Sequence, residues 1–361
     1  MELKDLFKAM AKSDASDLHL KPGEPPVFRI SGKLRRAEGA PLDVGAIEAL
    51  FASVLDERLK GDLERRGYAD FALDPPELGR YRCNCFRASG TMSAAIRRVK
   101  PRIPTLAELN LPESLARIAD WPDGLVLVGG PTGCGKTSTI ASLLDRINHQ
   151  RPAHIITVED PIEYLYTDDK SVIHQRELGL DVPNLEEALR SVVREDPDVL
   201  MLGELRDTMT VELALHAAET GHLVFGTVHA TSAVQTINRL LDLFPATRHA
   251  QIRSNLVFNL RCVTNQRLLP CLDPALPRIP AVETLFMSPV MKKFLLDGDT
   301  NRMQEALQRD TESGSEDYKR VLMRLHKTKR INAETALAAA PNPEEIRMAL
   351  RGINFTEGGI V

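Results

Sequence analysis

The sequence predicts an α/β protein built from more than one domain. Its 361 residues exceed what a single hydrophobic core usually organises. From residue 124 to about residue 270, short uninterrupted apolar runs alternate with segments of helical periodicity. This alternation is typical of a mostly parallel sheet covered by helices on both faces. Hydrophobic residues make up 43% and charged residues 27%, which is the profile of a globular protein.

Residues 1–100 predict a small α/β domain of their own. A helical apolar pattern opens it over residues 3–10, and residues 79–87 alternate apolar with basic or polar side chains. The second pattern is typical of a half-buried strand. Prolines then recur through residues 101–122, which we interpret as a linker.

The next domain is predicted over residues 123–280, and a helical region over 281–361. Strands buried on both faces read as continuous apolar runs rather than alternating ones. Residues 125–128 form such a run, and further strands are predicted over residues 154–158, 199–202 and 223–225. Asn184, with Glu187 three residues later, has the capping-box spacing that begins a helix. After Pro289 the pattern is helical almost to the end.

Composition excludes several classes of protein. The net charge of -4 provides no general attraction to nucleic acid or to an anionic membrane. The N-terminus lacks the features of a signal peptide, and no stretch approaches the ~18 apolar residues of a membrane-spanning helix. Five scattered cysteines indicate reduced thiols rather than a metal cluster. We therefore expect a cytoplasmic protein with no nucleic-acid partner and no direct membrane insertion.

The strongest motif is a glycine-rich turn that reads GPTGCGKT over residues 130–137 and matches G-x-x-x-x-G-K-[ST]. Glycines let backbone N–H groups turn inward around a phosphate, and the helix that follows adds a positive N-terminus. Lys136 can reach the β- and γ-phosphates, and Thr137 can hold Mg²⁺. A chance glycine-rich turn is the alternative, but the predicted strand before it and helix after it disfavour that reading. The predicted nucleotide contacts on this loop are Gly130, Thr132, Gly133, Cys134, Gly135, Lys136, Thr137 and Ser138, and His222 is a further predicted contact outside it.

Acidic residues follow two of the predicted strands. Glu159, Asp160 and Glu163 come after the second strand, at the edge where open α/β sheets bind ligands. One of them can activate a water molecule and others can hold the hydration shell of a metal. The third strand ends in Glu204, with Gly203 at the position usually held by the Walker-B aspartate. The alternatives are a solvated acidic turn and a strand that ends in glutamate by chance.

Two histidines, His222 and His229, bracket the fourth predicted strand. His229 follows the strand, where a sensor of the γ-phosphate would lie, and His222 precedes it. A purely structural histidine is the alternative for each. A zinc site is disfavoured because no further ligands cluster nearby.

Six arginines lie within one short region of the chain, namely Arg80, Arg82, Arg87, Arg97, Arg98 and Arg102. They can form a solvated basic face, an RNA-binding strand, or arginine fingers that complete a neighbouring subunit's site. Only Tyr81 and Phe86 are interleaved with them, so stacking on bases is poorly supported. We select Arg82 and Arg97 as the candidate arginine fingers.

Five runs of the sequence together resemble the secretion-ATPase superfamily in their order and spacing. They are GPTGCGKT, ITVEDPIEY, HQRELGLD, LRSVVREDPDVLMLGELRD and AAETGHLVFGTVHATSA. Within the superfamily the chain resembles the retraction ATPases of type IV pili, the PilT and PilU group. Residues 16–20 also resemble the N-terminal opening of that group, so the resemblance extends from about residue 3 to about residue 350.

The resemblance implies a PAS-like α/β domain followed by a RecA-like P-loop domain with a C-terminal helical region. It implies a homohexameric ring that uses ATP and Mg²⁺. Hydrolysis in this family drives depolymerisation of the pilus and twitching motility from the cytoplasmic side of the inner membrane. An inner-membrane platform protein of the pilus is the implied partner, and a paralogous pilus ATPase is a further one.

The resemblance also implies a role for each motif residue. Lys136 and Thr137 correspond to the Walker-A pair. Glu159, Asp160 and Glu163 fall in the Asp box, with Glu163 as the carboxylate that activates water. Thr137 and Asp160, together with the Walker-B acid, would serve the metal ion.

The remaining motif residues fall in three further elements of the family. Glu204 corresponds to the Walker-B acid, and His222 and His229 lie in the His box. Arg82 and Arg97 fall where family members reach across the boundary between subunits.

Two features of the sequence bear on which subfamily of secretion ATPases the chain resembles. The chain lacks the tetracysteine element and the longer N-terminal region of pilus-assembly and type II secretion ATPases, which favours retraction. The retraction group has a motif Ala-Ile-Arg-Asn-Leu-Ile-Arg-Glu where this chain has Val290–Asp297, and its second basic residue is replaced by Leu296. An accessory PilU-like role therefore stays open. A non-hydrolysing regulatory subunit and a nucleic-acid translocase are the alternatives from other classes.

Overall fold

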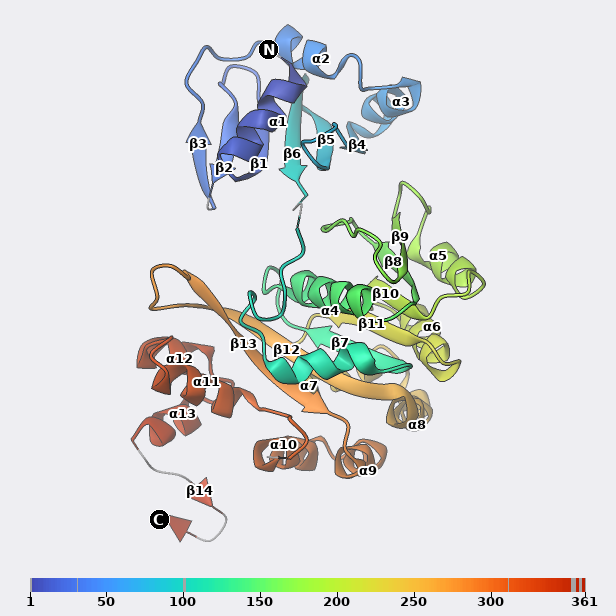
Figure 1. Ribbon diagram of the computed structural model, residues 1–361, viewed down its shortest axis with the longest axis vertical. Helices are drawn as coiled ribbons and strands as arrows, with labels where there is room; N and C mark the ends of the chain where they lie inside the picture. The colour runs from blue at the N-terminus through green and yellow to red at the C-terminus, as the bar shows by residue number, and fades with distance from the viewer. Residues whose placement is uncertain are drawn as a thin grey trace. The chain divides into compact units, whose positions relative to one another are not determined.

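The computed structural model describes residues 2–30, 32–99, 102–310 and 312–351, and the backbone of 355–356 and 359–360. The chain divides into two compact units, which are each described separately (Figure 1). Unit 1 comprises Met1–Arg102 and Ile162–Leu165, and unit 2 comprises Ile103–Pro161 and Tyr166–Val361. Both units combine helices with sheets, so the predicted α/β class is confirmed.

Unit 1 is an antiparallel sheet of six strands with three helices, and the strand order is β3-β2-β1-β6-β5-β4. The strands are β1 (Ala15–Leu20), β2 (Val27–Ile30), β3 (Lys33–Arg36), β4 (Tyr68–Leu73), β5 (Tyr81–Ala88) and β6 (Thr91–Arg98). The helices are α1 (Leu3–Lys12), α2 (Val44–Phe51) and α3 (Glu57–Arg66). The predicted helical pattern over residues 3–10 is confirmed, because the apolar side chains of α1 are buried.

The core of unit 1 forms where these helices meet one face of the sheet. The ring of Tyr81 stacks on that of Phe7 with 4.1 Å between centroids, and the Tyr81 hydroxyl donates a hydrogen bond to the Phe7 carbonyl at 3.1 Å. The ring therefore buries apolar area while its single polar group stays satisfied. This pair ties α1 to β5.

Unit 2 is built on a sheet of seven strands in the order β13-β12-β7-β11-β10-β8-β9. Every neighbouring pair is parallel except β12 and β13, which are antiparallel. The strands are β7 (Gly124–Gly129), β8 (His154–Glu159), β9 (Val172–Glu177), β10 (Val199–Glu204), β11 (Leu223–Val228), β12 (Leu260–Pro270) and β13 (Arg278–Phe286).

The helices of unit 2 precede, separate and follow these strands. Two short 3-10 helices are η1 (Glu113–Asp120) and η2 (Ala246–Arg248). Within the sheet region lie α4 (Lys136–Gln150), α5 (Leu185–Val192), α6 (Thr208–Glu219), α7 (Ala233–Asp242) and α8 (His249–Asn259). After the sheet come α9 (Pro289–Asp297), α10 (Thr300–Arg309), α11 (Tyr318–Lys327), α12 (Ala333–Ala339) and α13 (Pro343–Leu350), then the paired strands β14 (Phe355–Thr356) and β15 (Gly359–Ile360).

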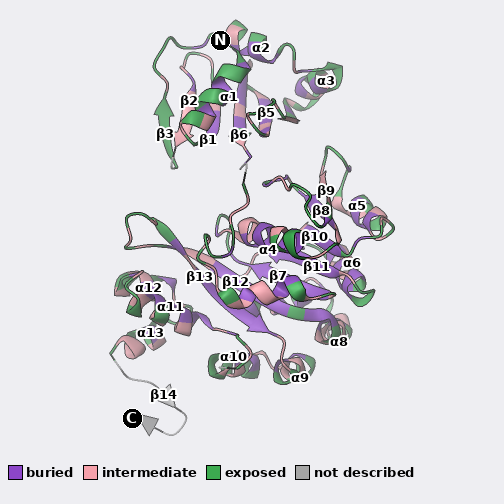
Figure 2. Ribbon diagram, in the orientation of Figure 1, coloured by how far each residue is buried: buried purple, intermediate pink, exposed green. Residues whose placement is uncertain are grey.

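Helices cover both faces of the central strands, as the predicted continuous apolar runs require. All six residues of β7 and all six of β11 are buried (Figure 2). Leu125 and Leu127 pack into the cluster that includes α6 and α7, whereas Val126 and Val128 pack into the cluster that includes α4 and η1. Successive side chains of one strand thus serve opposite layers.

The predicted helix start at Asn184 is confirmed, because its side-chain oxygen accepts from the Glu187 backbone N–H at 2.9 Å. The four predicted strands correspond to β7, β8, β10 and β11. Strands β9, β12 and β13 were not predicted individually. The last two carry polar residues inside buried strands, including Asn265 and Glu283, and these interrupt the apolar pattern.

The compact units differ from the predicted domain limits at two places. Within the predicted linker, Leu115 and Ile118 of η1 are fully buried in the unit 2 core. The predicted boundary after residue 280 falls inside β13. Proline content indicates where regular strands and helices stop, but it does not report whether the intervening chain packs onto a neighbour.

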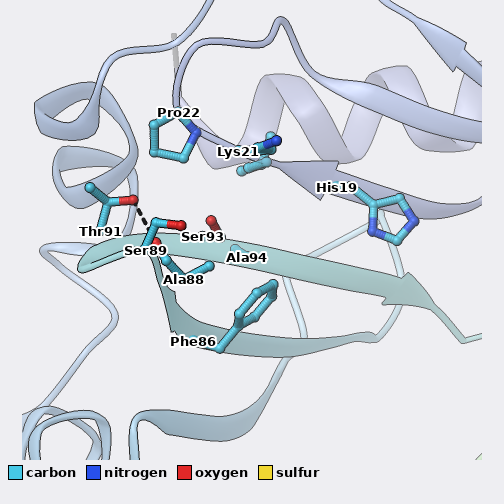
Figure 3. A pocket seen from close by; sticks show the side chains of 10 residues that line it. His19, Lys21, Pro22, Phe86, Ala88, Ser89, Thr91, Ser93 and Ala94 are labelled. Atoms are coloured by element: carbon cyan, nitrogen blue, oxygen red, sulfur yellow. Dashed lines mark hydrogen bonds between the residues drawn. The ribbon is translucent and has the colours of Figure 1, made fainter.

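Within the described part of the chain, every helix is too short or too polar to cross a bilayer. Unit 1 contains a cavity of about 390 Å³ beside β1 and the hairpin of β5 and β6 (Figure 3). His19, Phe86 and Ser93 are among its lining residues, and the Thr91 hydroxyl donates to the Ala88 carbonyl at its rim. None of the residues predicted for nucleotide binding lines this cavity.

Candidate active site

The glycine-rich loop joins β7 to α4 at the carboxyl edge of the unit 2 sheet. Gly130, Gly133 and Gly135 have φ angles of 138°, 77° and 97°, which side-chain-bearing residues rarely adopt. A Cβ atom on Gly130 would also lie 2.4 Å from the Gln266 carbonyl oxygen and 2.6 Å from Cys134 Sγ. The motif therefore needs glycine at Gly130 for two independent reasons, the backbone conformation and the close approach of β12.

Lys136 begins α4 and folds back over the loop. Its Nζ donates to the Gly130 carbonyl at 2.9 Å and to the Pro131 carbonyl at 3.2 Å. The N-terminus of this 15-residue helix concentrates positive potential at the same place. Thr137 lies in the first helical turn beside Lys136, so the predicted Walker-A pair shares one end of the helix.

The other predicted contacts on the loop differ in how they can serve a phosphate. Thr132 and Gly133 are exposed, and Ser138 is half-buried. The Cys134 side chain is buried, and burial raises the pKa of its thiol. A neutral thiol turned into the core leaves only the backbone of Cys134 for a ligand.

Gln266 on β12 supports the loop from below, and nothing in the sequence predicted this. Its Nε2 donates to the Cys134 carbonyl at 2.9 Å, and its Oε1 accepts from the Thr139 hydroxyl at 2.9 Å. Both ends of a buried amide are thus satisfied, which is what a buried polar group requires. The available signal was the run of polar residues from Thr264 to Arg267 between the apolar pairs Cys262-Val263 and Leu268-Leu269.

Glu204 ends β10 beside the end of β11. One carboxylate oxygen, Oε2, lies 2.8 Å from an Arg206 guanidinium nitrogen and 3.4 Å from His229 Nε2. Burial raises the pKa of Glu204, but the Arg206 hydrogen bond and the positive charges of His229, Arg206 and Lys136 outweigh it, so the pKa is lowered overall. Glu204 is therefore held as a carboxylate, and Arg206 is a site residue that the sequence analysis missed.

His229 links Glu204 to the phosphate-binding loop. Its Nδ1 lies 3.2 Å from the Gly130 carbonyl, which can only accept, so Nδ1 is the donor. Its Nε2 faces Glu204. The structure thus brings Lys136, Glu204 and His229 together around Gly130, and their roles stay predictions.

The three acidic residues after β8 occupy different environments. Glu159 is buried, and its Oε1 accepts from the Thr157 hydroxyl at 2.6 Å and from Gln175 Nε2 at 3.2 Å. Asp160 is exposed at the strand end, and its charge adds to the Glu204 hydrogen bond and charge that raise the pKa of Arg206. Glu163 is exposed in the short segment that groups with unit 1. Their separate catalytic roles stay predictions.

His222 does not lie near the loop that follows β7. It precedes β11, so six strand residues, or about 20 Å, separate it from His229. Its Nδ1 donates to the Ala217 carbonyl at 2.8 Å, which closes the turn after α6. The predicted contact of His222 with nucleotide is inconsistent with this position, because parallel strands present their amino ends at the opposite edge.

Arg82 and Arg97 lie in unit 1 as direct cross-strand neighbours on β5 and β6. Arg97 Nε donates to Asp17 Oδ1 at 2.7 Å. Burial raises the pKa of Asp17, but the bonds and charge of Arg97 and the Ser16 hydroxyl lower it further, so the net change is downward. The role of both residues as arginine fingers stays a prediction.

The phosphate-binding loop, Lys136 and Glu204 together have the chemistry of a nucleotide site. A loop that needs positive-φ glycines, a lysine at a helix N-terminus and a carboxylate at the end of the neighbouring strand can bind and polarise a triphosphate. Helices cover both faces of a mostly parallel sheet around them. Together they define a P-loop nucleoside triphosphatase.

Comparison with known proteins identifies the group within that class. The family described as Type II/IV secretion system protein matches residues 89–335. The chain is 38% identical over 344 residues to the Type IV pilus retractation ATPase PilT of Pseudomonas aeruginosa, covering 95% of this chain and 99% of that one. It is 33% identical over 351 residues to the Type IV pilus ATPase PilU of the same organism, covering 97% and 92%.

A solved structure agrees with these matches. The crystal structure of the pilus retraction motor PilT with bound ADP superposes with a TM-score of 0.90 at 38% identity, over 96% of this chain and 98% of that one. The chain belongs to the type II/IV secretion system protein family. It is an ATPase that uses a nucleotide, as the sequence predicted.

Proposed function

We propose that this protein is the ATP-hydrolysing motor of type IV pilus retraction. The observation that carries the proposal is its likeness to PilT over nearly the whole length of both chains, in sequence and in fold. The clustering of Lys136, Glu204 and His229 supports an active rather than a vestigial site.

The chemistry of the site assigns a task to each group. Lys136 and the loop backbone bind the phosphates, and His229 senses the terminal phosphate beside Glu204. Glu163 serves as the base that activates water, which rests on its place in the motif. Buried Glu159 keeps the end of β8 in position through its bonds to Thr157 and Gln175.

A Mg²⁺ ion fits this donor set. The described residues contain no cluster of three or more side chains that could hold a metal by themselves. Magnesium at a triphosphate relies instead on phosphate oxygens, water and one or two protein oxygens. The Thr137 hydroxyl would hold the ion, with Glu204 and Asp160 binding its waters. When bound, the ion neutralises charge that develops on the phosphates.

We further propose that six copies form a ring. Arg82 and Arg97 would act on the nucleotide of a neighbouring subunit, which their adjacent positions on β5 and β6 support. The ring would work in the cytoplasm at the inner-membrane base of the pilus, on a platform protein, and its movements would release pilin subunits from the fibre.

An accessory role beside a second pilus ATPase is the other candidate. The observation that favours it is α9, where Leu296 stands in place of a basic residue and is 53% exposed. An accessory motor would hydrolyse ATP yet fail to support retraction alone. Near-full-length likeness to PilU is consistent with that outcome.

The test is ATP turnover per protomer across a range of protein concentrations, with Glu204→Gln as the inactive control. A steep rise with concentration that the control lacks supports a shared-site oligomeric ATPase. Pilus retraction is then scored in cells that carry the wild-type or the Glu204→Gln chain as the sole copy. Normal retraction in Glu204→Gln cells contradicts the motor assignment, and turnover without retraction by the wild-type chain favours the accessory role.

A further inference from the structure

The loop that carries His229 is anchored to the C-terminal helices through the edge of the sheet. This sensor loop, residues 229–232, joins β11 to α7. Three side chains of β12 and β13 each contact the sensor loop or the start of α7 on one side and the C-terminal helices on the other. They are Asn265, Arg267 and Glu283.

Asn265 forms the first connection. Its Nδ2 donates to the Ala230 carbonyl at 3.1 Å, one residue after His229. Its Oδ1 accepts from the hydroxyl of Tyr318, the first residue of α11, at 2.8 Å. Asn265 and Tyr318 are 0% and 1% exposed, so water cannot replace either partner.

Arg267 forms the second connection, with its two terminal nitrogens bonded in different directions. One donates to the Thr231 carbonyl at 3.0 Å, and the other donates to the Ala339 carbonyl at the end of α12. The guanidinium also lies 4.8 Å from the centroid of the Tyr318 ring. A planar fork of donors suits such a double contact in a way that a lysine does not.

Glu283 forms the third connection, between two helix N-termini. One carboxylate oxygen accepts from the Ala233 backbone N–H, where α7 begins. The other accepts from the Tyr318 backbone N–H at 3.3 Å, where α11 begins. A carboxylate is the natural group for two helix N-termini, although the 1% exposure of Glu283 makes its charge costly.

We propose that Asn265, Arg267 and Glu283 are positioning residues through which α11 and α12 set the placement of His229 and thereby the rate of ATP hydrolysis. The inference rests on the proposed role of His229 as phosphate sensor. The anchored carbonyls belong to the two residues that follow His229, so a shift of α11 or α12 moves the imidazole relative to Glu204. His229 also contacts the phosphate-binding loop at Gly130, but that loop has support of its own from Gln266. Movement of the C-terminal helices therefore changes kcat more than nucleotide affinity.

The test compares Tyr318→Phe with Tyr81→Phe in the full-length protein. Each substitution deletes one buried hydroxyl that donates a hydrogen bond, but the Tyr81 bond lies within unit 1, whereas the sensor loop belongs to unit 2. We measure kcat, KM for ATP, the Kd for ADP and the Tm. Tyr318→Phe is expected to lower kcat about fivefold, in line with one lost hydrogen bond, and to leave the Kd for ADP within about twofold. Tyr81→Phe is expected to lower Tm alone.

Arg267→Lys is the second variant, because it keeps the charge and loses the fork that joins Thr231 to Ala339. It is expected to reproduce the kcat effect even if Tyr318→Phe folds poorly. Unchanged kcat in both variants, or a parallel loss of kcat and ADP affinity, overturns the proposal. Turnover by the wild-type chain that Glu204→Gln abolishes is measured in the same assay. It shows that the ATPase assignment stands whatever these variants do.

Discussion

His229 and Glu204 face each other across the ends of neighbouring parallel strands, with 3.4 Å between Nε2 and the carboxylate oxygen. The opposite nitrogen of the same imidazole reaches the Gly130 carbonyl of the phosphate-binding loop. One side chain thus contacts the two motifs that define the nucleotide site. A change at the terminal phosphate has a direct path to the end of β11 and the loop beyond it.

The two histidines that flank β11 should differ in their effect on catalysis. His229→Ala removes the link between Glu204 and the Gly130 carbonyl, so we expect kcat to fall roughly tenfold or more. His222→Ala removes a bond that closes the turn after α6, so we expect a modest loss of Tm with near-normal kcat. Steady-state ATP turnover and thermal unfolding of both variants check this. An equal loss of kcat in both variants would show that the catalytic role of a histidine does not depend on which end of β11 it occupies.

Arg206 should control the pH dependence of turnover through Glu204. The Arg206 bond and charge help to keep the pKa of Glu204 below its ordinary value despite burial. A lowered folded-state pKa means that the active carboxylate persists as pH falls, until that pKa is reached. Arg206→Ala should therefore move the acidic limb of the kcat profile to higher pH. Arg206→Lys retains the charge and should move it less. Superimposable acidic limbs for all three proteins would contradict this assignment.

Gly130 and Gly133 should tolerate alanine to different extents. Both have positive φ angles, but only Gly130 also brings its added Cβ against the backbone of β12. Gly133→Ala should cost about 1 kcal/mol of unfolding free energy, and Gly130→Ala about 2–4 kcal/mol together with loss of ADP binding. Denaturant unfolding without nucleotide separates the two. Similar costs would mean that the contact with Gln266 is not tight in solution.

Glu283 should make stability fall as pH rises. Burial raises its pKa to about 7, with Asp317 adding to the effect and the bonds from Ala233 and Tyr318 and the charge of Arg267 opposing it. The folded state therefore binds this proton more tightly than the unfolded chain, whose value is near 4.5. The stabilisation that Glu283 contributes is fully present below its unfolded-state pKa. It is lost as pH rises through about 7, and the loss is of order 3 kcal/mol of unfolding free energy.

Glu283→Gln removes that titration, so the free energy of unfolding should depend less steeply on pH between about 4.5 and 7. Denaturant unfolding at a series of pH values measures the slope. An unchanged slope would show that the carboxyl group of Glu283 keeps its ordinary pKa in the folded protein.

Much of the fold was predictable because its signals are local. Asn184 begins a helix through a bond to a residue three positions away, and β7 is recognisable because every residue in it is apolar. The unit limits were not predictable in the same way. Leu115 and Ile118 look like part of a proline-rich linker until the surface that buries them is known.

Some residues of the candidate site were likewise predictable from local motifs, and others were not. Lys136, Thr137 and Glu204 belong to motifs whose spacing reports the chemistry directly. Arg206 and Gln266 belong to none. In the sequence, His222 directly precedes β11 and His229 directly follows it, and nothing local distinguishes their roles. The direction of the strand shows that the two histidines lie at opposite edges of the sheet.

The sequence by itself determined the class of protein, the phosphate-binding loop and the carboxylates near it, because contiguous residues encode each of these. The tertiary structure decided which distant residues complete the site. Gln266 reaches the loop from 132 positions away, and Tyr318 reaches Asn265 from 53 positions away. Such pairs meet because strand order brings β12 beside β7, and strand order is set by packing of the whole sheet rather than by any local pattern.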